Sequence, residues 1–169
     1  MKKSIMRRWL VNNLSVIVAV LVALIVVLSN VIYAYVYNGI LQVLKGRSDE
    51  LTIMFSDYTD TSSADFFLNA RTYVENFPDK ASMEVSVINS YGLSVMTSTG
   101  FAPDNTQEKP DYEQARRSEE GFGTWTGTLS SGEKVMAVTR VLHDSSGADI
   151  GAIRYVVSMD KADRQITTL

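Results

Sequence analysis

The chain of 169 residues contains no cysteine and only one histidine, His143. Without cysteine it can form no disulfide bond and offers no thiolate as a nucleophile or metal ligand. A single histidine excludes a histidine-rich metal site, and the sequence around His143 marks no nucleophile that this side chain could activate. We therefore expect no metal site, no cofactor and no catalytic residues in the chain.

Nucleotide-binding motifs are also missing. Neither of the glycine-rich phosphate loops, GxxxxGK[S/T] and GxGxxG, occurs in the sequence. Glycoside hydrolysis needs two facing carboxylates, but the acidic residues here are scattered through expected loops and one short helix. The densest acidic group lies between Glu108 and Glu120, and we interpret it as a solvated face. The residues of this chain give no support for an enzyme.

A long stretch without any charged residue, from Trp9 to Leu44, dominates the N-terminal quarter of the chain. Within it, Leu14 to Ile32 is almost wholly apolar and would be about 28 Å long as a helix at about 1.5 Å per residue. The hydrocarbon core of a bilayer is about 30 Å thick. We expect a transmembrane helix over residues 10–37, after a stub of residues 1–9.

Charge next to this segment predicts its orientation. Lys2, Lys3, Arg7 and Arg8 precede it, whereas no acidic residue occurs before Asp49. Positive charge beside a first membrane span stays in the cytoplasm. The sequence therefore predicts a plasma-membrane protein with a cytoplasmic N-terminus and with residues 45–169 outside.

A cleaved signal peptide is the alternative for this segment. Signal peptides have apolar regions of about 7–15 residues and a small-residue cleavage site, and Ser29 to Tyr37 offers no good site of that kind. Beyond the four leading cations, the chain keeps 12 basic and 19 acidic residues. An acidic outer part argues against nucleic acid as a partner.

A heptad pattern follows the apolar segment. Its 4-3-4-3-4 spacing is typical of a helix that packs on a partner, with a flaw at the arginine. That partner is either the same helix of a second copy, in a homodimer, or the domain's own sheet. We expect a signalling helix over residues 38–60, with Leu44, Leu51, Met54 and Tyr58 at the dimer contact. The full pattern comprises Ile40, Leu44, Arg47, Leu51, Met54 and Tyr58.

The remaining residues predict one α+β domain with a five-stranded antiparallel sheet. Apolar residues at helical spacing indicate a helix from about residue 62 to Phe77, with its aromatic face in the core. A second helix is expected from Asp111, which we interpret as its cap, to Glu120. The strand expected at 134–143 is apolar on both faces, which is typical of a central strand. The other strands are expected at 83–89, 93–98, 124–129 and 150–158, and a last helix at 161–169.

Three stretches resemble the extracytoplasmic PAS-like, or single Cache, sensor domains of bacterial sensor histidine kinases. The hairpin from Val85 to Ser98 is similar to the family's strand, D-x-x-G turn and strand, with Asn89 in place of the aspartate. Residues 112–125 are similar to its short helix and glycine-bounded strand. Residues 134–143 with 150–158 are similar to its last two strands. The resemblance implies a sensor domain over residues 61–159, with a Gram-positive bacterium as the expected source.

The resemblance also implies a function that this chain cannot complete alone. Proteins of this family continue through a second membrane span into a kinase core, and residues 160–169 would lead toward that span. A response regulator would be a partner only through the missing kinase. We therefore expect the sensing portion of a two-component histidine kinase. The alternatives are an anchored accessory protein, or the sensor region of a chemoreceptor or a nucleotide cyclase.

Arginines on the expected roof helix and strands suggest a ligand site. In the family the short helix covers the ligand pocket, and arginine forks suit carboxylates and phosphates. We expect Tyr112, Arg116, Trp125 and Arg140 to line a pocket for a small anion. The alternative is that the arginines lie at the surface and the tryptophan packs in the core. The signal itself, a small molecule or a protein, is not identified by the sequence.

Overall fold

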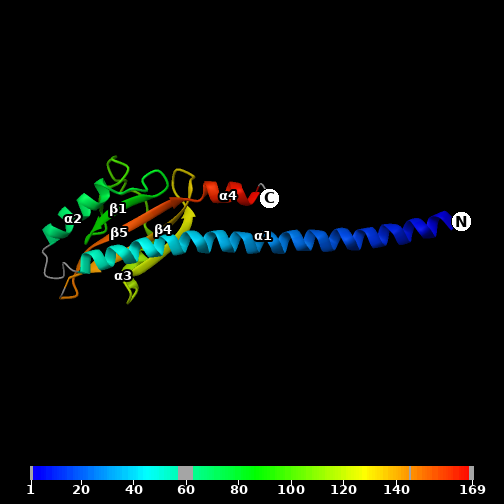
Figure 1. The fold of residues 1–169 in the computed structure, drawn as a ribbon, viewed down its shortest axis with the longest axis horizontal. Coiled ribbons are helices and arrows are strands. Elements are labelled where there is room, and N and C mark those ends of the chain that lie inside the picture. The colour runs from blue at the N-terminus through cyan, green and yellow to red at the C-terminus, as the bar shows by residue number, and fades with distance from the viewer. Residues whose placement is uncertain (1, 57–62, 145, 168–169) are drawn as a thin grey trace.

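The computed structural model describes the backbone of residues 2–56, 63–144 and 146–167, and side chains within 8–50, 65–144, 146–160 and 162–164. Five strands and four helices are described (Figure 1). The expected α+β class with a five-stranded antiparallel sheet is confirmed. In chain order the elements are α1 (Lys2–Ser56), α2 (Ser63–Glu75), β1 (Glu84–Asn89), β2 (Ser94–Thr97), α3 (Pro110–Arg117), β3 (Phe122–Thr128), β4 (Lys134–His143), β5 (Asp149–Ser158) and α4 (Asp160–Thr167).

The sheet has the strand order β2-β1-β5-β4-β3, and every pair is antiparallel. The central strand is therefore β5, which pairs with β1 on one edge and with β4 on the other. The expectation that β4 is the central strand was wrong, because β4 lies next to the central strand, between β5 and β3. Its apolar pattern has the expected cause, however, because Val135 to Thr139 are buried on both faces of the sheet.

The two faces of the sheet carry different helices. Val138 of β4 packs in one core with Leu44 of α1 and Phe66 of α2. Its neighbour Thr139 donates a hydrogen bond to Asp111 of α3. Because successive side chains of a strand point to opposite faces, α1 and α2 cover one face and α3 covers the other.

Helix α1 runs without a break from the apolar segment into the domain (Figure 1). Every side chain from Trp9 to Val31 is exposed, so this part is not the buried core helix of a soluble protein. It is the one helix, among the described residues, that is long and apolar enough to cross a membrane. Farther along, Leu44 and Ser48 have no exposed surface. The expected division at residues 37 and 38 is therefore not a break in the helix.

The heptad pattern faces the protein's own sheet in the part that is described. Leu44 is fully buried in the core of its own domain, and Ile40 packs against the same core. Leu44 is therefore not available to a second copy, and the expectation of a dimer contact there was wrong. Leu51 and Met54 lie where side chains are not described, and Tyr58 lies outside the described residues.

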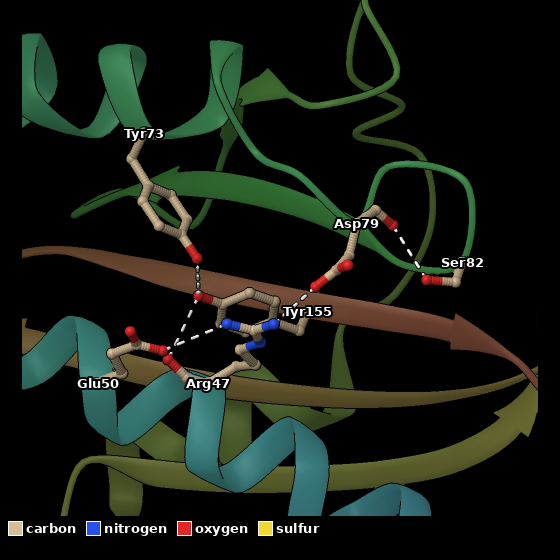
Figure 2. A network of polar contacts seen from close by, with 6 residues as sticks. All are labelled: Arg47, Glu50, Tyr73, Asp79, Ser82 and Tyr155. Atoms are coloured by element: carbon tan, nitrogen blue, oxygen red, sulfur yellow. Dashed lines mark hydrogen bonds and ion pairs between the residues drawn. The ribbon is translucent and has the colours of Figure 1, made fainter.

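Polar contacts join α1 to the rest of this face. Arg47 of α1 forms ion pairs with Glu50 and with Asp79 in the loop after α2, at 3.4 and 2.8 Å. The hydroxyl groups of Tyr73 in α2 and Tyr155 in β5 are 3.0 Å apart. Figure 2 shows these side chains meeting between α1, α2 and β5. The helix that leads out of the domain is thus fixed to the central strand by apolar and polar contacts.

The exit from the sheet is also tied to α1. Asp163 of α4 accepts a hydrogen bond from Tyr37 of α1, at 2.8 Å, and from Lys134 of β4, at 2.9 Å. Lys134 also lies over the rings of Tyr33 and Tyr37. In Figure 1 the C-terminal end of α4 points the same way as the N-terminal half of α1. The chain enters and leaves the domain at one end.

Candidate functional site

Two of the four residues expected at the ligand site lie together on the face covered by α3. The side chain of Tyr112 is buried, and its ring packs against Gly92 in the β1–β2 turn. The guanidinium of Arg116 lies 5.9 Å from the centre of the Tyr112 ring and 3.7 Å from a carboxylate oxygen of Asp149. This pair fixes α3 to the hairpin and to β5.

Trp125 lies on the same face but packs along its own strand. Its register partner is Ala137 of β4, which shares a face with Thr139. The indole covers Gly127, because a Cβ atom at that glycine would lie 2.1 Å from the tryptophan ring. The described contacts of Trp125 thus place it over β3 rather than against Tyr112.

Arg140 lies on the opposite face of the sheet, since it alternates with Thr139 along β4. Its guanidinium pairs with Asp49 of α1, donates a hydrogen bond to the Glu120 carbonyl at 2.7 Å, and lies over the Phe122 ring. The structure therefore does not bring the four expected residues into one pocket. Arg140 instead fastens α1 to the edge of the sheet.

A buried ion pair that the sequence did not indicate lies beneath α3. Arg154 of β5 donates from Nε and Nη2 to the two carboxylate oxygens of Asp111, at 2.7 and 3.0 Å. Thr139 donates a third hydrogen bond to Asp111, at 2.5 Å. The Asp111 side chain is fully buried and the Arg154 side chain is 9% exposed. Two charges removed from water need this many partners, because an unpaired buried charge is strongly destabilising.

The interpretation of Asp111 as a helix cap was therefore wrong. Helix α3 begins at Pro110, the capping position belongs to Lys109, and no side chain caps it. Asp111 lies in the first turn, where its carboxylate turns inward to Arg154. One sequence signal could have found this pair. Arg154 stands in the middle of an apolar strand, and a charge there requires a buried partner.

A small cavity of about 120 Å³ adjoins this ion pair on the same face. Its floor is formed by β1 and β5, where Ser86 and Arg154 are register partners. One wall is the loop before α3, and Asn105 holds that loop to β2 through two hydrogen bonds with the backbone of Ser94, at 2.7 and 2.9 Å. The lining residues are Glu84, Ser86, Ser94, Thr97, Pro103, Asp104, Gln107, Lys109, Leu129, Arg154 and Val156.

Two cations converge on this cavity. Burial lowers the pKa of the Lys109 ammonium, and the nearby charge of Arg154 lowers it further. Lys109 has a neutral hydrogen-bond partner, the Asn105 side chain at 3.3 Å. The carboxylates of Asp111 and Asp104 oppose this lowering in part. Among the described residues, no group of three or more histidine and acidic side chains could hold a metal ion.

Comparisons with known proteins identify the fold. No family model and no curated protein matches the chain. Among solved structures it is similar to the ligand-binding domain of the Pseudomonas aeruginosa PAO1 amino acid chemoreceptor PctC, in complex with GABA. The TM-score is 0.59 at 11% identity, over 84% of this chain and 63% of that one.

The extracellular domain of the proposed histidine kinase rpHK1S-Z16 also matches, with a TM-score of 0.49 at 18% identity, over 84% of this chain and 59% of that one. The chain thus spans less than two thirds of the length of either structure. Neither comparison supports the expected Gram-positive source. The chain has one apolar N-terminal helix followed by the PAS-like, Cache-type fold of extracellular sensor domains.

Proposed function

We propose that this chain is the membrane-anchored sensing region of a bacterial two-component histidine kinase, with residues 45–169 outside the cytoplasm. A signal bound by the domain would be relayed across the membrane to a kinase core that this chain does not contain. A response regulator would be reached only through that core. The fold and the apolar helix support a receptor, and the histidine kinase output rests on the sequence resemblance.

The observation that carries the proposal is the continuity of α1. Its first half has the exposed apolar surface that a lipid bilayer would cover, from Trp9 to Val31. Its second half packs into the core of the domain at Leu44 and Ser48. Because no loop separates these halves, a movement of the sheet against α1 would be transmitted along a rigid element. Coupling of this kind between two sites is typically about 1–3 kcal/mol.

The contacts around Asp163 supply a second route for the signal. β5 leads directly into α4, and Asp163 of α4 is held by Tyr37 of α1 and Lys134 of β4. A ligand that shifts β5 would change the position of α4 relative to α1. A shift of this kind requires different affinities of the ligand for the two arrangements.

We also propose a parallel homodimer, formed through the face of α1 that the domain leaves uncovered. Tyr35 and Val43 on this face are 81% and 58% exposed. A Cβ atom added at Gly39 or Gly46 would meet nothing within 4 Å, so a second helix could approach closely there. Two copies anchored in one membrane with the same orientation would present this face to each other.

Cysteine crosslinking tests the dimer directly, because the natural chain has no cysteine. In membranes, Val43→Cys should form a disulfide-linked dimer on oxidation. Leu44→Cys is the matched control, one residue away and buried in its own domain. If Val43→Cys gives no more dimer than Leu44→Cys, the proposed contact is wrong.

Single cysteines also test the orientation. A cysteine at Ser131, in the exposed β3–β4 turn, should react with a membrane-impermeant maleimide in intact cells. A cysteine at Ser4 should react only after the membrane is permeabilised. The opposite pattern would refute the extracytoplasmic location, and the loss of the first 35 residues or so would favour the cleaved signal peptide.

The reading frame after Leu169 tests the class of output. A second span followed by a phosphoacceptor helix and an ATP-binding domain would support the histidine kinase. A methyl-accepting signalling domain or a cyclase domain would assign the chain to another receptor class. A stop codon would favour an anchored accessory protein that acts on a neighbour.

A further inference from the structure

We propose that the end of the domain nearest the membrane lies in the phospholipid headgroup layer, and that Lys134 binds a lipid phosphate there. We call this end the basal end; it comprises residues 129–134, which are the β3–β4 turn and the start of β4, and residues 160–164 of α4. Because it rests on the proposed membrane anchor, this inference adds the bilayer surface as a partner of the domain itself.

Helix α1 gives the height of its residues above the bilayer, because it continues without a break and rises by about 1.5 Å per residue. With the hydrocarbon core ending at Ile32, Tyr33 and Tyr37 lie about 1.5 and 7.5 Å beyond it. With the core ending at Ser29, Tyr33 lies about 6 Å beyond it. A headgroup layer is roughly 5–8 Å thick, since a bilayer of about 40–45 Å has a hydrocarbon core of about 30 Å. Tyr33 therefore lies in the headgroup layer in either case.

Lys134 lies at the same height as these tyrosines. Its ammonium is 3.4 Å from the Tyr33 hydroxyl, and it lies over the rings of Tyr33 and Tyr37, 5.5 and 5.2 Å from their centres. Figure 1 shows α4 starting at this end of the sheet, and Asp163 of α4 contacts Tyr37. No spacer separates the domain from the apolar part of α1, so the basal end meets the headgroups.

The ammonium of Lys134 is suited to a phosphate at this height. Its side chain is 35% exposed, although it donates a hydrogen bond to Asp163 at 2.9 Å. Hydrogen bonds to Tyr37 and Asp163 raise the pKa of Lys134. The lysine thus keeps its charge beside the lipid, where a low dielectric would favour the neutral form. Lysine binds phosphate as a point charge, so a lipid phosphate would share this ammonium with Asp163.

The charges of the basal end fit a zwitterionic phospholipid. Beyond the four leading cations the chain has 19 acidic and 12 basic residues, and such an excess of acid is repelled by an anionic surface. The basal end has no such excess. Its charged residues are Glu133, Asp160, Asp163, Lys134, Lys161 and Arg164. Glu133 and Asp160 are exposed, and their carboxylates suit the amine of a headgroup whose phosphate lies at Lys134.

Fluorescence quenching measures the depth of the basal end, with the full chain in phosphatidylcholine vesicles. Ser131→Cys places a fluorescent maleimide in the β3–β4 turn, and Ser90→Cys places it in the β1–β2 turn, both at exposed positions. Ser90→Cys is the matched control, because the neighbouring Asn89 pairs with Gly151, about 23 Å along β5 from Ser158 at the basal end. A nitroxide on the lipid headgroup should quench the label at Ser131 at least twofold more than the label at Ser90. Equal quenching would overturn the inference.

Thermal unfolding in two lipids tests the phosphate at Lys134. The natural chain should unfold at a higher temperature in phosphatidylcholine bilayers than in bilayers of digalactosyldiacylglycerol, which has no phosphate. Lys134→Gln should lose most of this difference, and Lys134→Arg should keep it. Asp163→Asn is the matched control, because it breaks the same ion pair within the protein but leaves the ammonium for the phosphate. It should keep the difference between the two lipids.

Three unfolding results would refute phosphate binding at Lys134. They are no difference between the two lipids for the natural chain, an undiminished difference in Lys134→Gln, and an equal loss of the difference in Lys134→Gln and Asp163→Asn. The quenching experiment leaves Lys134 in place, so it does not depend on whether these variants fold. Flotation with vesicles in a density gradient tests the anchor separately. A chain that does not float would refute the proposed membrane receptor, whereas a chain that floats without quenching at Ser131 would refute this inference alone.

Discussion

Replacing Asp111 with alanine should destabilise the domain more than any change at an exposed ion pair. The carboxylate is fully buried and accepts three hydrogen bonds, two from Arg154 and one from Thr139. Its removal leaves the charge of Arg154 in a site that is 9% exposed. Breaking a buried pair in this way costs about 3–5 kcal/mol. For a domain of roughly 100 residues, this corresponds to a fall in the unfolding midpoint of at least about 10 °C.

Thermal unfolding of the full chain in nanodiscs, followed by tryptophan fluorescence, measures this fall. Glu75→Ala is the matched control, because it breaks the exposed Arg71–Glu75 pair, which has the same 2.7 Å distance, and such pairs contribute little. The double variant Asp111→Leu with Arg154→Met should recover most of the loss, since no uncompensated charge remains. The reasoning is refuted if Asp111→Ala unfolds at the same temperature as Glu75→Ala.

Further predictions concern α4, β3 and β5. The hydrogen bond from Lys134 holds the pKa of Asp163 below its usual value. The stabilisation of the folded state by the ionised Asp163 is therefore fully present above the usual carboxyl pKa, and it is lost as the pH falls through the lowered pKa. The unfolding midpoint of Asp163→Asn should therefore depend less on pH in this acid range than that of the natural chain. Gly123→Ala should lower the free energy of unfolding by about 1–3 kcal/mol through overpacking in the same unfolding assay, because its Cβ atom would lie 2.0 Å from the Asp111 carbonyl oxygen. Tyr155→Phe should cost about 1 kcal/mol in a urea titration, because it removes the hydrogen bond to Tyr73.

The elements of the fold could be predicted because each has a local signal. The expected strand at 134–143 has the same bounds as β4, since its apolar run ends in charged and turn residues on both sides. The aromatic face expected before Pro78 is buried as predicted, with Phe66 and Phe77 each 3% exposed. The spacing of apolar residues predicts these elements because buried positions recur with the period of the helix or strand.

The site could not be predicted in the same way, because its contacts join residues far apart in the chain. Asp111 and Arg154 are 43 positions apart. Arg140 was as good a candidate as Arg154 by residue type, and a strand that is apolar on both faces does not indicate which face of the sheet each arginine lies on. The heptad pattern likewise could not separate a second copy from the domain's own sheet, and Leu44 packs on the sheet.

The unbroken course of α1 fixes the rotational phase between the lipid-facing surface and the sensor. An α-helix turns by about 100° for each residue, so a single alanine inserted after Ile32 would turn the whole domain by that angle around its anchor. A second inserted residue would turn the domain further. About seven inserted residues would return the domain close to its original orientation around the helix axis, displaced along that axis by about 10 Å. Receptor output plotted against the number of inserted residues should then oscillate, whereas a flexible tether would give a flat line.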